Sequence, residues 1–326
     1  MIRSFVFSKG RLLSQDLTLD VLRMVLYEED VQIWVDVEQP TEEETKGLLE
    51  GVFNFHPLAI EDCIAISDDP KADDYEQYLF LVLHAVESAS DGFRPTELNL
   101  FIGKNYLVTY HQRPLRSVAS TIERVMKNPL AVARAPDRLT YTLLDFFLDE
   151  YQPALDRFSA DINELEQTAL QGPTADFLEK ILRHKKEVQR LKQIVAPQHE
   201  VLARIGRGEF RIIRANLLPY YRDLLDRLVR INNLADTCHN SLINTLQVYL
   251  SVQQSQVNHV IKVLTVLATL ALPIIAISSF YGMNLNHFPG LGPTGWTWPA
   301  AYAWVFGITG ATTLWIYLVL KKNKWL

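Results

Sequence analysis

The sequence predicts an α/β domain at the N-terminus, followed by a long helical stalk and two C-terminal transmembrane helices. Three observations support this fold class. Short runs rich in β-branched and aromatic residues alternate with helical patterns over residues 1–112. Residues 220–272 contain neither glycine nor proline. Two long uncharged apolar runs, 263–280 and 300–320, lie near the C-terminus.

The average composition conceals this organisation. The 326 residues are 48% hydrophobic with a net charge of −6, and their mean hydropathy is +0.01, as in a soluble acidic protein. Residues 1–236, however, carry 28 basic and 38 acidic groups, whereas residues 237–326 carry four lysines and no acid. This split indicates two environments along one chain. The composition excludes a disordered chain, and the presence of only Cys63 and Cys238 excludes a disulfide scaffold.

The first predicted domain, residues 1–135, is a cytoplasmic α/β domain. Thr41 is a plausible helix N-cap and Glu44 completes a capping box. The domain has no phosphate-binding loop, dinucleotide fingerprint, nucleophile elbow or zinc-protease motif, so we expect no enzyme activity. The strand-like segments are 2–7, 31–37, 78–86, 97–103 and 105–111, and the helical patterns lie near 16–26, 41–52 and 57–66.

The second predicted segment, residues 136–218, is helical. From Leu139 onward the apolar residues follow a helical period in two long amphipathic stretches. Pro153 lies in the first stretch and Pro197 in the second, and each is a potential kink. Gly172 and Pro173 indicate a turn between the stretches, with Thr174 as the cap of the second helix.

The third predicted segment, residues 219–280, is a stalk helix that continues into the first membrane span. The 53 positions from 220 to 272 without glycine or proline allow one helix of roughly 80 Å. A pattern of this length without caps is typical of a coiled coil, a membrane span or both. We therefore expect a stalk that enters the bilayer.

Both apolar runs are long enough to cross a membrane. The first has 18 residues and the second 21, whereas a spanning helix needs about 20. Five of the six tryptophans, Trp296, Trp298, Trp304, Trp315 and Trp325, lie in or beside this region, as in an interfacial aromatic belt. The alternative is a pair of buried core helices in a soluble protein.

The distribution of lysines predicts the orientation. Lys321, Lys322 and Lys324 form a basic tail, 321–326, directly after the second span, whereas the connecting loop 281–299 has no lysine or arginine. The positive-inside rule places this tail, as a basic ring, at the cytoplasmic face. Two crossings place the N-terminal domain in the cytoplasm as well, and the N-terminus shows no secretory apolar region. We expect both cysteines to be reduced thiols, because neither has the spacing of a metal site.

One face of the stalk and first span carries a stripe that changes from amides to apolar residues and then to a hydroxyl. The stripe begins at Gln247, Leu250 and Gln254. Two interpretations remain open on the pattern alone: a pore face repeated around a symmetry axis, and a helix-packing face. An amide ring followed by apolar rings would suit a channel that gates by dewetting. The candidate pore-lining residues are Asn258, Ile261, Leu264, Thr265, Ala268, Leu272, Ile275 and Ser279.

The sequence at the end of the first span favours the pore. Gly282-Met283-Asn284 follows this span, Pro273 lies within it, and an uncharged loop and the lysine-rich tail come after it. This arrangement resembles the CorA family of divalent-cation channels over essentially the whole chain. The resemblance implies a homopentameric funnel in the plasma (inner) membrane, a central pore lined by the first span, and influx of Mg²⁺ or of Co²⁺ and Ni²⁺. It implies the lipid bilayer as a partner, no nucleic acid and no catalytic cofactor.

The resemblance assigns the selectivity filter to Gly282, Met283 and Asn284. A ring of Asn284 carbonyls can hydrogen-bond the hydration shell of Mg²⁺, which sheds water reluctantly. Gly282 would permit a helix-ending turn at positive φ, and Met283 would pack behind the ring. Influx needs no ATP, because a divalent ion gains about 4.6 kcal/mol per 100 mV.

The resemblance also implies gating by intracellular divalent cations bound to carboxylates between neighbouring subunits. Matching segments point to Glu61 and Asp62 in HPLAIEDC, Asp145 in YTLLD and Asp223 in YYRD. Clustered carboxylates repel one another until a cation bridges them. The alternative is that these four residues are ordinary solvated acids.

Two other functions remain open. Residues 285–299 contain no acid, and only His287 is ionisable there, so a zinc transporter like the related ZntB branch is the first alternative. His239, His259 and His287 would be candidate zinc ligands, although they lack a matching spacing. The second alternative is a membrane-anchored metal-sensing scaffold that conducts nothing.

Overall fold

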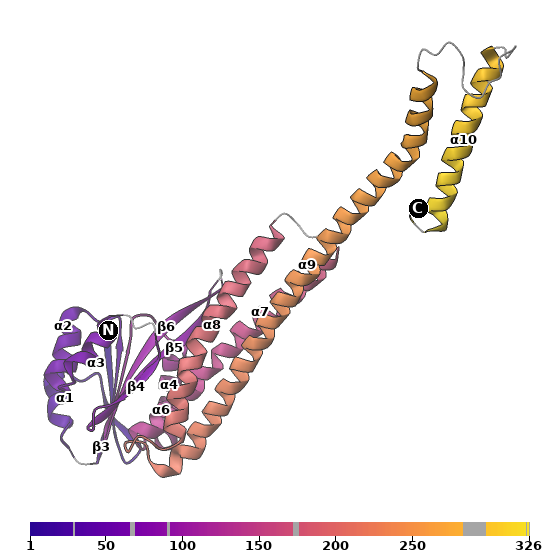
Figure 1. The fold of residues 1–326 in the computed structure, drawn as a ribbon. Helices are drawn as coiled ribbons and strands as arrows, with labels where there is room; N and C mark the ends of the chain where they lie inside the picture. Colours follow the sequence, from indigo (N-terminus) through magenta and orange to yellow (C-terminus); the bar gives the residue numbers. More distant parts are fainter. Residues whose placement is uncertain are drawn as a thin grey trace. The chain divides into compact units, whose positions relative to one another are not determined.

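The computed structural model describes residues 1–28, 30–65, 69–89, 92–171, 176–282, 298–323 and 325. The chain divides into two compact units, Met1–Leu246 and Gln247–Leu326. The first contains an α/β domain and the beginning of a long helix, and the second contains the end of that helix and one further helix (Figure 1).

A seven-stranded mixed sheet forms the centre of the first unit, in the order β2-β1-β3-β7-β6-β5-β4. β3 and β7 run parallel, and the other neighbouring strands run antiparallel. The parallel pairing places the C-terminal ends of β3 and β7 side by side, with Glu38 opposite His111. The strands are β1 (Ile2–Ser8), β2 (Arg11–Gln15), β3 (Val31–Glu38), β4 (Lys71–Asp74), β5 (Tyr78–Ala89), β6 (Gly92–Gly103) and β7 (Tyr106–His111).

One face of the sheet packs against the helices that precede β4. Ile33, Val35 and Val37 of β3 share a buried core with these helices, because alternate residues of a strand point to the same face. The stacked rings of Phe55 and Phe101, 4.0 Å apart between centroids, lie in this core. The helices are α1 (Leu19–Val25), α2 (Glu42–Thr45), the π-helical η1 (Lys46–Val52) and α3 (Pro57–Ile64).

The opposite face of the sheet is covered by the later helices of the first unit (Figure 1). Tyr151 is fully buried there, where its hydroxyl donates to the carbonyl of His84 at 2.5 Å and accepts from the Gln198 amide at 2.7 Å. These helices are α4 (Arg116–Lys127), α5 (Pro129–Val132), α6 (Pro136–Asp149), α7 (Tyr151–Gln171) and α8 (Phe177–Gly206).

The long helix α9 (Leu218–Tyr281) follows the short 3₁₀ turn η2 (Ala215–Leu217). Its first half buries residues at steps of three and four, from Tyr221 and Leu224 to Leu242, which is the spacing of one helical face. The helix continues through Pro273, and its last turns change direction (Figure 1). Proline causes such a change because it removes a backbone donor and its ring crowds the preceding turn.

The second unit pairs the end of α9 with α10 (Trp298–Lys322). The two helices lie side by side in Figure 1. Each is long and apolar enough to cross a membrane, and most of their large apolar side chains are exposed. These exposed surfaces are what a lipid environment accommodates.

The predicted fold class is confirmed. The five predicted strands are present, and Thr41 and Glu44 form the expected capping box, with backbone-to-side-chain bonds of 2.9 and 3.2 Å. Two details differ from the prediction. β2 and β4 did not emerge from the sequence pattern. The first amphipathic stretch is two helices, α6 and α7, and Pro153 lies in the first turn of α7, where its missing N–H costs no helical bond. Thr174 lies outside the described residues.

Candidate functional site

The eight candidate pore-lining residues lie on the membrane half of α9 and are all exposed in the protomer. Asn258 accepts a 3.2 Å hydrogen bond from the Gln254 amide one turn earlier. Thr265 donates to the carbonyl of Ile261 at 2.7 Å, which leaves both acceptor lone pairs of its hydroxyl unused by this bond. This face is therefore free to meet other copies of α9 or water.

α10 packs near a different face of α9. A groove of about 610 Å³ between the two helices is lined on the α9 side by Leu270 and Ile274 and on the α10 side by residues from Phe306 to Tyr317. At 100° per residue, Leu270 points about 160° away from Ala268 and Leu272. The groove residues and the predicted pore-lining residues are thus separate sets on roughly opposite faces of α9.

Gly282 lies directly after α9, where its backbone N–H donates to the carbonyl of Ser278 at 2.8 Å. The expectation of a positive φ at this residue is wrong: Gly282 is outside the left-handed region. Glycine is needed for a different reason, since a Cβ would lie 2.9 Å from the Ser278 carbonyl oxygen. The other two predicted filter residues, Met283 and Asn284, lie outside the described residues.

Two of the four predicted regulatory carboxylates, Asp145 of α6 and Asp223 of α9, belong to one charge cluster. Arg227, one turn after Asp223, donates to both Asp145 and Asp149. Burial raises the pKa of Asp145, the Asp149 and Asp223 carboxylates raise it further, and Arg227 lowers it. This stalk-base cluster, Asp145, Asp149, Asp223 and Arg227, contains three carboxylates for one cation.

The other two, Glu61 and Asp62, lie on α3 at the edge of a cavity of about 870 Å³. Lys71 of β4 donates to Asp62 at 2.5 Å and lies 3.4 Å from Asp73. Burial lowers the pKa of Lys71, but Asp62 and Asp73 outweigh it and raise the pKa above its ordinary value. This second cluster is also rich in acids, because Glu61 and Asp74 line the same cavity.

The two acidic clusters remain separate within one chain. Glu61 and Asp62 lie on α3, which packs on one face of the sheet. Asp145 lies on α6, on the opposite face, and Asp223 lies on α9 beside it. The four predicted residues therefore do not form one site within the protomer.

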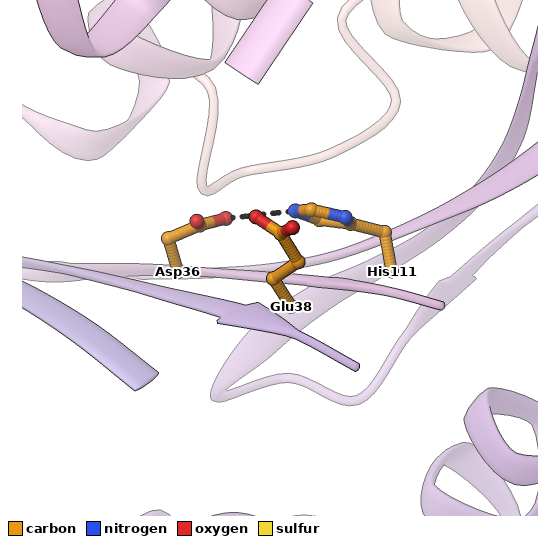
Figure 2. Close-up of side chains that lie close together, drawn as sticks. All are labelled: Asp36, Glu38 and His111. Carbon is orange, nitrogen blue, oxygen red and sulfur yellow. Dashed lines mark hydrogen bonds and ion pairs between the residues drawn. The ribbon is translucent and has the colours of Figure 1, made fainter. Parts of the chain in front are cut away.

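A third group of acids lies at the end of the parallel strand pair (Figure 2). Asp36, Glu38 and His111 place potential ligand atoms within 4.8 Å of one another. The sequence did not predict this group, because Asp36 and Glu38 lie on β3 whereas His111 lies on β7. Among the described residues, it is the one set of three such side chains with metal-like spacing.

The side chains of this third group already have partners within the protein. Arg3 of β1 donates to Asp36 at 2.7 Å and to Glu38 at 3.0 Å. The His111 Nδ1 lies 2.6 Å from the Arg113 carbonyl and its Nε2 lies 3.1 Å from Asp36, so each ring nitrogen already has an oxygen partner. A metal ion at this position would have to displace Arg3 from both carboxylates. The arrangement fits a structural ion cluster, not a metal centre.

The remaining predicted residues are dispersed. Lys321 and Lys322 form the last turn of α10, and Lys324 lies outside the described residues. His239 and His259 are both on α9 and belong to no metal-like group in the described part of the chain. His287 lies outside the described residues. Cys63 and Cys238 are buried free thiols.

Sequence reasoning missed Asp149 and Arg227, although a signal for both was present. Each lies four residues after a predicted ligand, Asp145 and Asp223 respectively. Residues at this spacing share one face of a helix. Placing α6 beside α9 required the structure.

The sequence model of the family described as "CorA-like Mg2+ transporter protein" matches residues 29–322. The chain is 28% identical over 284 residues to the cobalt/magnesium transport protein CorA of Thermotoga maritima, covering 84% of this chain and 78% of that protein. Similarity to this relative therefore includes both the α/β domain and most of the helical C-terminal part.

Solved structures show the same fold. The complete structure of the CorA magnesium transporter from Methanocaldococcus jannaschii superposes with a TM-score of 0.82 at 19% identity, over 99% of this chain and 98% of that chain. The cytoplasmic domain of ZntB from Vibrio parahaemolyticus gives a TM-score of 0.59 at 13% identity, over 69% of this chain and 88% of that chain. At these identities the likeness concerns architecture.

Proposed function

This chain belongs to the family of CorA-like Mg²⁺ transporter proteins, and from that premise we propose that it is a channel for Mg²⁺ influx gated by intracellular divalent cations. Members of this family are membrane transporters of divalent cations, not enzymes. We further propose a homopentamer in the plasma (inner) membrane with both termini in the cytoplasm.

The exposed stripe on the membrane half of α9 is the observation that carries this proposal. Two helices of one chain cannot enclose a water path, so the path requires copies of α9 around an axis. The face from Asn258 to Ser279 is exposed and lies away from the groove beside α10. With this face turned inward, Leu264, Leu272 and Ile275 would form apolar rings below a hydroxyl ring at Ser279. Apolar rings close a path by dewetting.

In this proposal the filter follows directly after the stripe. The hydrogen bond from Gly282 to Ser278 fixes the end of α9, and Asn284 lies two residues further along the chain. Amide carbonyls suit a cation that keeps its water, because they accept from the hydration shell without carrying a charge that would hold the ion tightly. Met283 would support the ring from behind.

The membrane potential supplies the driving force for inward flow. A divalent cation gains about 4.6 kcal/mol for each 100 mV, twice the ~2.3 kcal/mol of a single charge. Lys321 and Lys322 at the end of α10, with Lys324, would form a basic ring at the cytoplasmic face. No catalytic cofactor is part of the proposal, and Mg²⁺ serves as both transported ion and regulatory ligand.

Flux into liposomes tests the conducting function. The purified full chain should admit Mg²⁺ when a potassium diffusion potential makes the lumen negative. Asn284→Ala should lower this flux at least about tenfold, since one lost ring of hydrogen bonds to a charged shell costs more than 1.4 kcal/mol. Asn286→Ala, in the same loop, is the matched control and should keep most of the flux.

The same assay decides between the other two functions. Zn²⁺ flux above Mg²⁺ flux would replace the proposal with zinc transport, which the acid-free loop 285–299 favours. No flux of any divalent cation from correctly oriented protein would favour the non-conducting scaffold.

For the gate, we propose that divalent cations bridge the two acidic clusters of neighbouring subunits. Glu61 and Asp62 would face Asp145 and Asp223 of the next copy. The excess of carboxylates over cations in the stalk-base cluster supports this assignment. When the cations leave, repulsion between these carboxylates would separate the subunits and release α9.

A double variant tests the gate. Asp62→Ala combined with Asp223→Ala should make uptake about tenfold less sensitive to Mg²⁺ on the cytoplasmic side, because each bridge loses a carboxylate from both partners. Asp226→Ala, an exposed acid on the same helix, is the control. Unchanged inhibition in the double variant would remove these residues from the sensor while leaving the conduction proposal intact.

A further inference from the structure

A basic cavity lies between α6 and the segment that leads into α9. It has a volume of about 450 Å³, within the usual range for small-molecule sites. Three arginines, one amide and one phenol supply its polar lining, namely Arg134, Arg138, Arg214, Asn216 and Tyr220. No carboxylate lines this cavity, although acids outnumber bases in the chain.

Two of the three guanidinium groups have no counter-ion in the described part of the chain. Arg134 donates only to the backbone carbonyl of Leu130, at 2.9 Å. Arg138 is held by two aromatic rings, with its guanidinium carbon 5.0 Å from the Tyr141 ring and 4.7 Å from the Tyr220 ring. Ring contacts fix the plane of Arg138 but leave its N–H donors available.

The third guanidinium is fixed by a buried acid. Asp137, whose side chain is 3% exposed, accepts from Arg214 at 2.7 Å through each of its two oxygens. It also accepts from the Arg214 backbone N–H at 3.1 Å. This bidentate pair neutralises Arg214, yet it uses only part of the five-donor fork. The cavity is thus pre-organised and retains about two uncompensated positive charges, those of Arg134 and Arg138.

We propose that this cavity binds a phosphate-bearing small molecule. A phosphate group carries close to two negative charges at pH 7 and three acceptor oxygens, which match two unpaired guanidinium forks better than one carboxylate does. The ligand would connect α6, through Arg138, to the first turn of α9, through Tyr220. This inference does not depend on the proposed transport function, because it concerns equilibrium binding of an anion.

Calorimetric titration of the full chain in neutral detergent tests the proposal. The probes are inorganic phosphate, pyrophosphate and ATP, used with EDTA and at constant ionic strength so that no cation bridges them to carboxylates. We expect saturable binding of pyrophosphate at one site per chain. Equal affinities for pyrophosphate and ATP would mean that the site recognises only the phosphate groups. Tighter binding of ATP would mean that the ligand is a nucleotide.

The variants localise the site. Arg138→Gln and Arg134→Gln should each weaken pyrophosphate binding at least about tenfold, since each removes charge-assisted hydrogen bonds. Arg124→Gln on α4 has the same change of charge at an exposed position and should bind within about twofold of the wild type. Arg134→Gln separates lost binding from misfolding, because the only hydrogen bond of the Arg134 side chain to another described residue is to the Leu130 carbonyl. The thermal unfolding of this variant, followed by circular dichroism, should match that of the wild type.

Three results would overturn the proposal. The first is no saturable binding to the wild-type chain. The second is binding that neither arginine variant weakens. The third is dissociation of the oligomer in the Arg134→Gln variant, measured by light scattering, without any pyrophosphate binding to the wild type. This last result would show that acids of a neighbouring copy fill the cavity.

Discussion

Two clusters combine carboxylates with basic side chains in different proportions: the sheet-edge cluster, Arg3, Asp36, Glu38 and His111, and the stalk-base cluster, Asp145, Asp149, Asp223 and Arg227. At the sheet edge, Arg3 and His111 contact two carboxylates, and Asp36 is fully buried. At the stalk base, Arg227 alone contacts two carboxylates and a third lies nearby. The side chains of Asp145 and Asp149 are 38% and 59% exposed.

The contrast shows why close spacing of acids is a poor criterion for a cation site. The sheet-edge cluster satisfies the geometric criterion for a metal, yet Arg3 already pairs with both of its carboxylates and His111 contacts Asp36. The stalk-base cluster fails that criterion within one chain but retains unbalanced negative charge and access to solvent. Charge balance and exposure therefore separate a cluster that stabilises the fold from one suited to bind a cation.

Removal of Asp36 should have the largest effect on stability. Asp36→Ala leaves Arg3, His111 and Thr109 without their common acceptor, and we expect the free energy of unfolding to fall by about 3 kcal/mol. Asp149→Ala at the stalk base is the matched control and should cost less than about 1 kcal/mol. Urea unfolding followed by circular dichroism measures both losses. Equal losses would mean that the two clusters stabilise the fold to the same extent.

On acidification, we expect Asp145 of the stalk-base cluster to be protonated before Asp36 of the sheet-edge cluster. Burial raises the pKa of Asp36, but His111, Thr109 and Arg3 outweigh it, so the pKa is lower than the ordinary 3.8. Its stabilisation is complete above pH 3.8 and is lost as pH falls through the lowered value. The pKa of Asp145 is instead raised, so this group takes up a proton at a higher pH, and we expect the proposed binding of a cation there to weaken first.

Two measurements check this order. Unfolding of the wild type and of Asp36→Ala should differ less at pH 2 than at pH 5. Protection of the protein by Mg²⁺ against thermal unfolding should weaken as the pH falls, at a higher pH than the loss of stabilisation by Asp36. A difference between wild type and variant that grows on acidification would contradict the sign for Asp36.

Removal of Arg227 should sharpen the contrast by making the stalk base still more acidic. Arg227→Gln takes away the one cation of the cluster, and we expect Mg²⁺ to bind about three- to tenfold more tightly, as for loss of one partly screened charge near a divalent ion. The midpoint of thermal protection by Mg²⁺ measures this change. Arg230→Gln, exposed on the same helix, controls for net charge and should have little effect.

The smallest effect should come from Glu38. Its side chain is 22% exposed, and Arg3 keeps its bond to Asp36 when Glu38 is lost. Glu38→Gln should therefore lower the free energy of unfolding by less than about 1 kcal/mol. A loss as large as that of Asp36→Ala would mean that the two carboxylates act as one unit.

Much of the fold follows from local patterns. The strands from Val31 and Tyr106 are rich in β-branched and aromatic residues, and the capping box at Thr41 has its own short-range signal. β2 and β4 carry no such signal: RLLSQ alternates weakly, and KADD is mostly charged. Both are edge strands that form because a long neighbour offers unpaired backbone groups.

The sites follow from the sequence less completely, for a similar reason. The helical spacing of Asp145 and Asp149, and of Asp223 and Arg227, is visible in the sequence, but their contact depends on α6 lying beside α9. The Arg3–Asp36–His111 group requires the order of three strands, which no local pattern contains. The resemblance pointed to carboxylates in α3, α6 and α9 but not to the basic side chains that contact them, Lys71 and Arg227.

The passage of α9 through Pro273 has a mechanical consequence. Proline lacks the N–H that would bond to the carbonyl of Thr269 one turn earlier, so α9 has one fewer backbone hydrogen bond at this position. In hydrocarbon an unbonded carbonyl is costly, and water on the inner side of a ring of such helices would relieve that cost. In the proposed ring of α9 copies, Pro273 would place a flexible point and an unpaired carbonyl at the same level, so a movement of the outer segment would change both the width and the hydration of the path there.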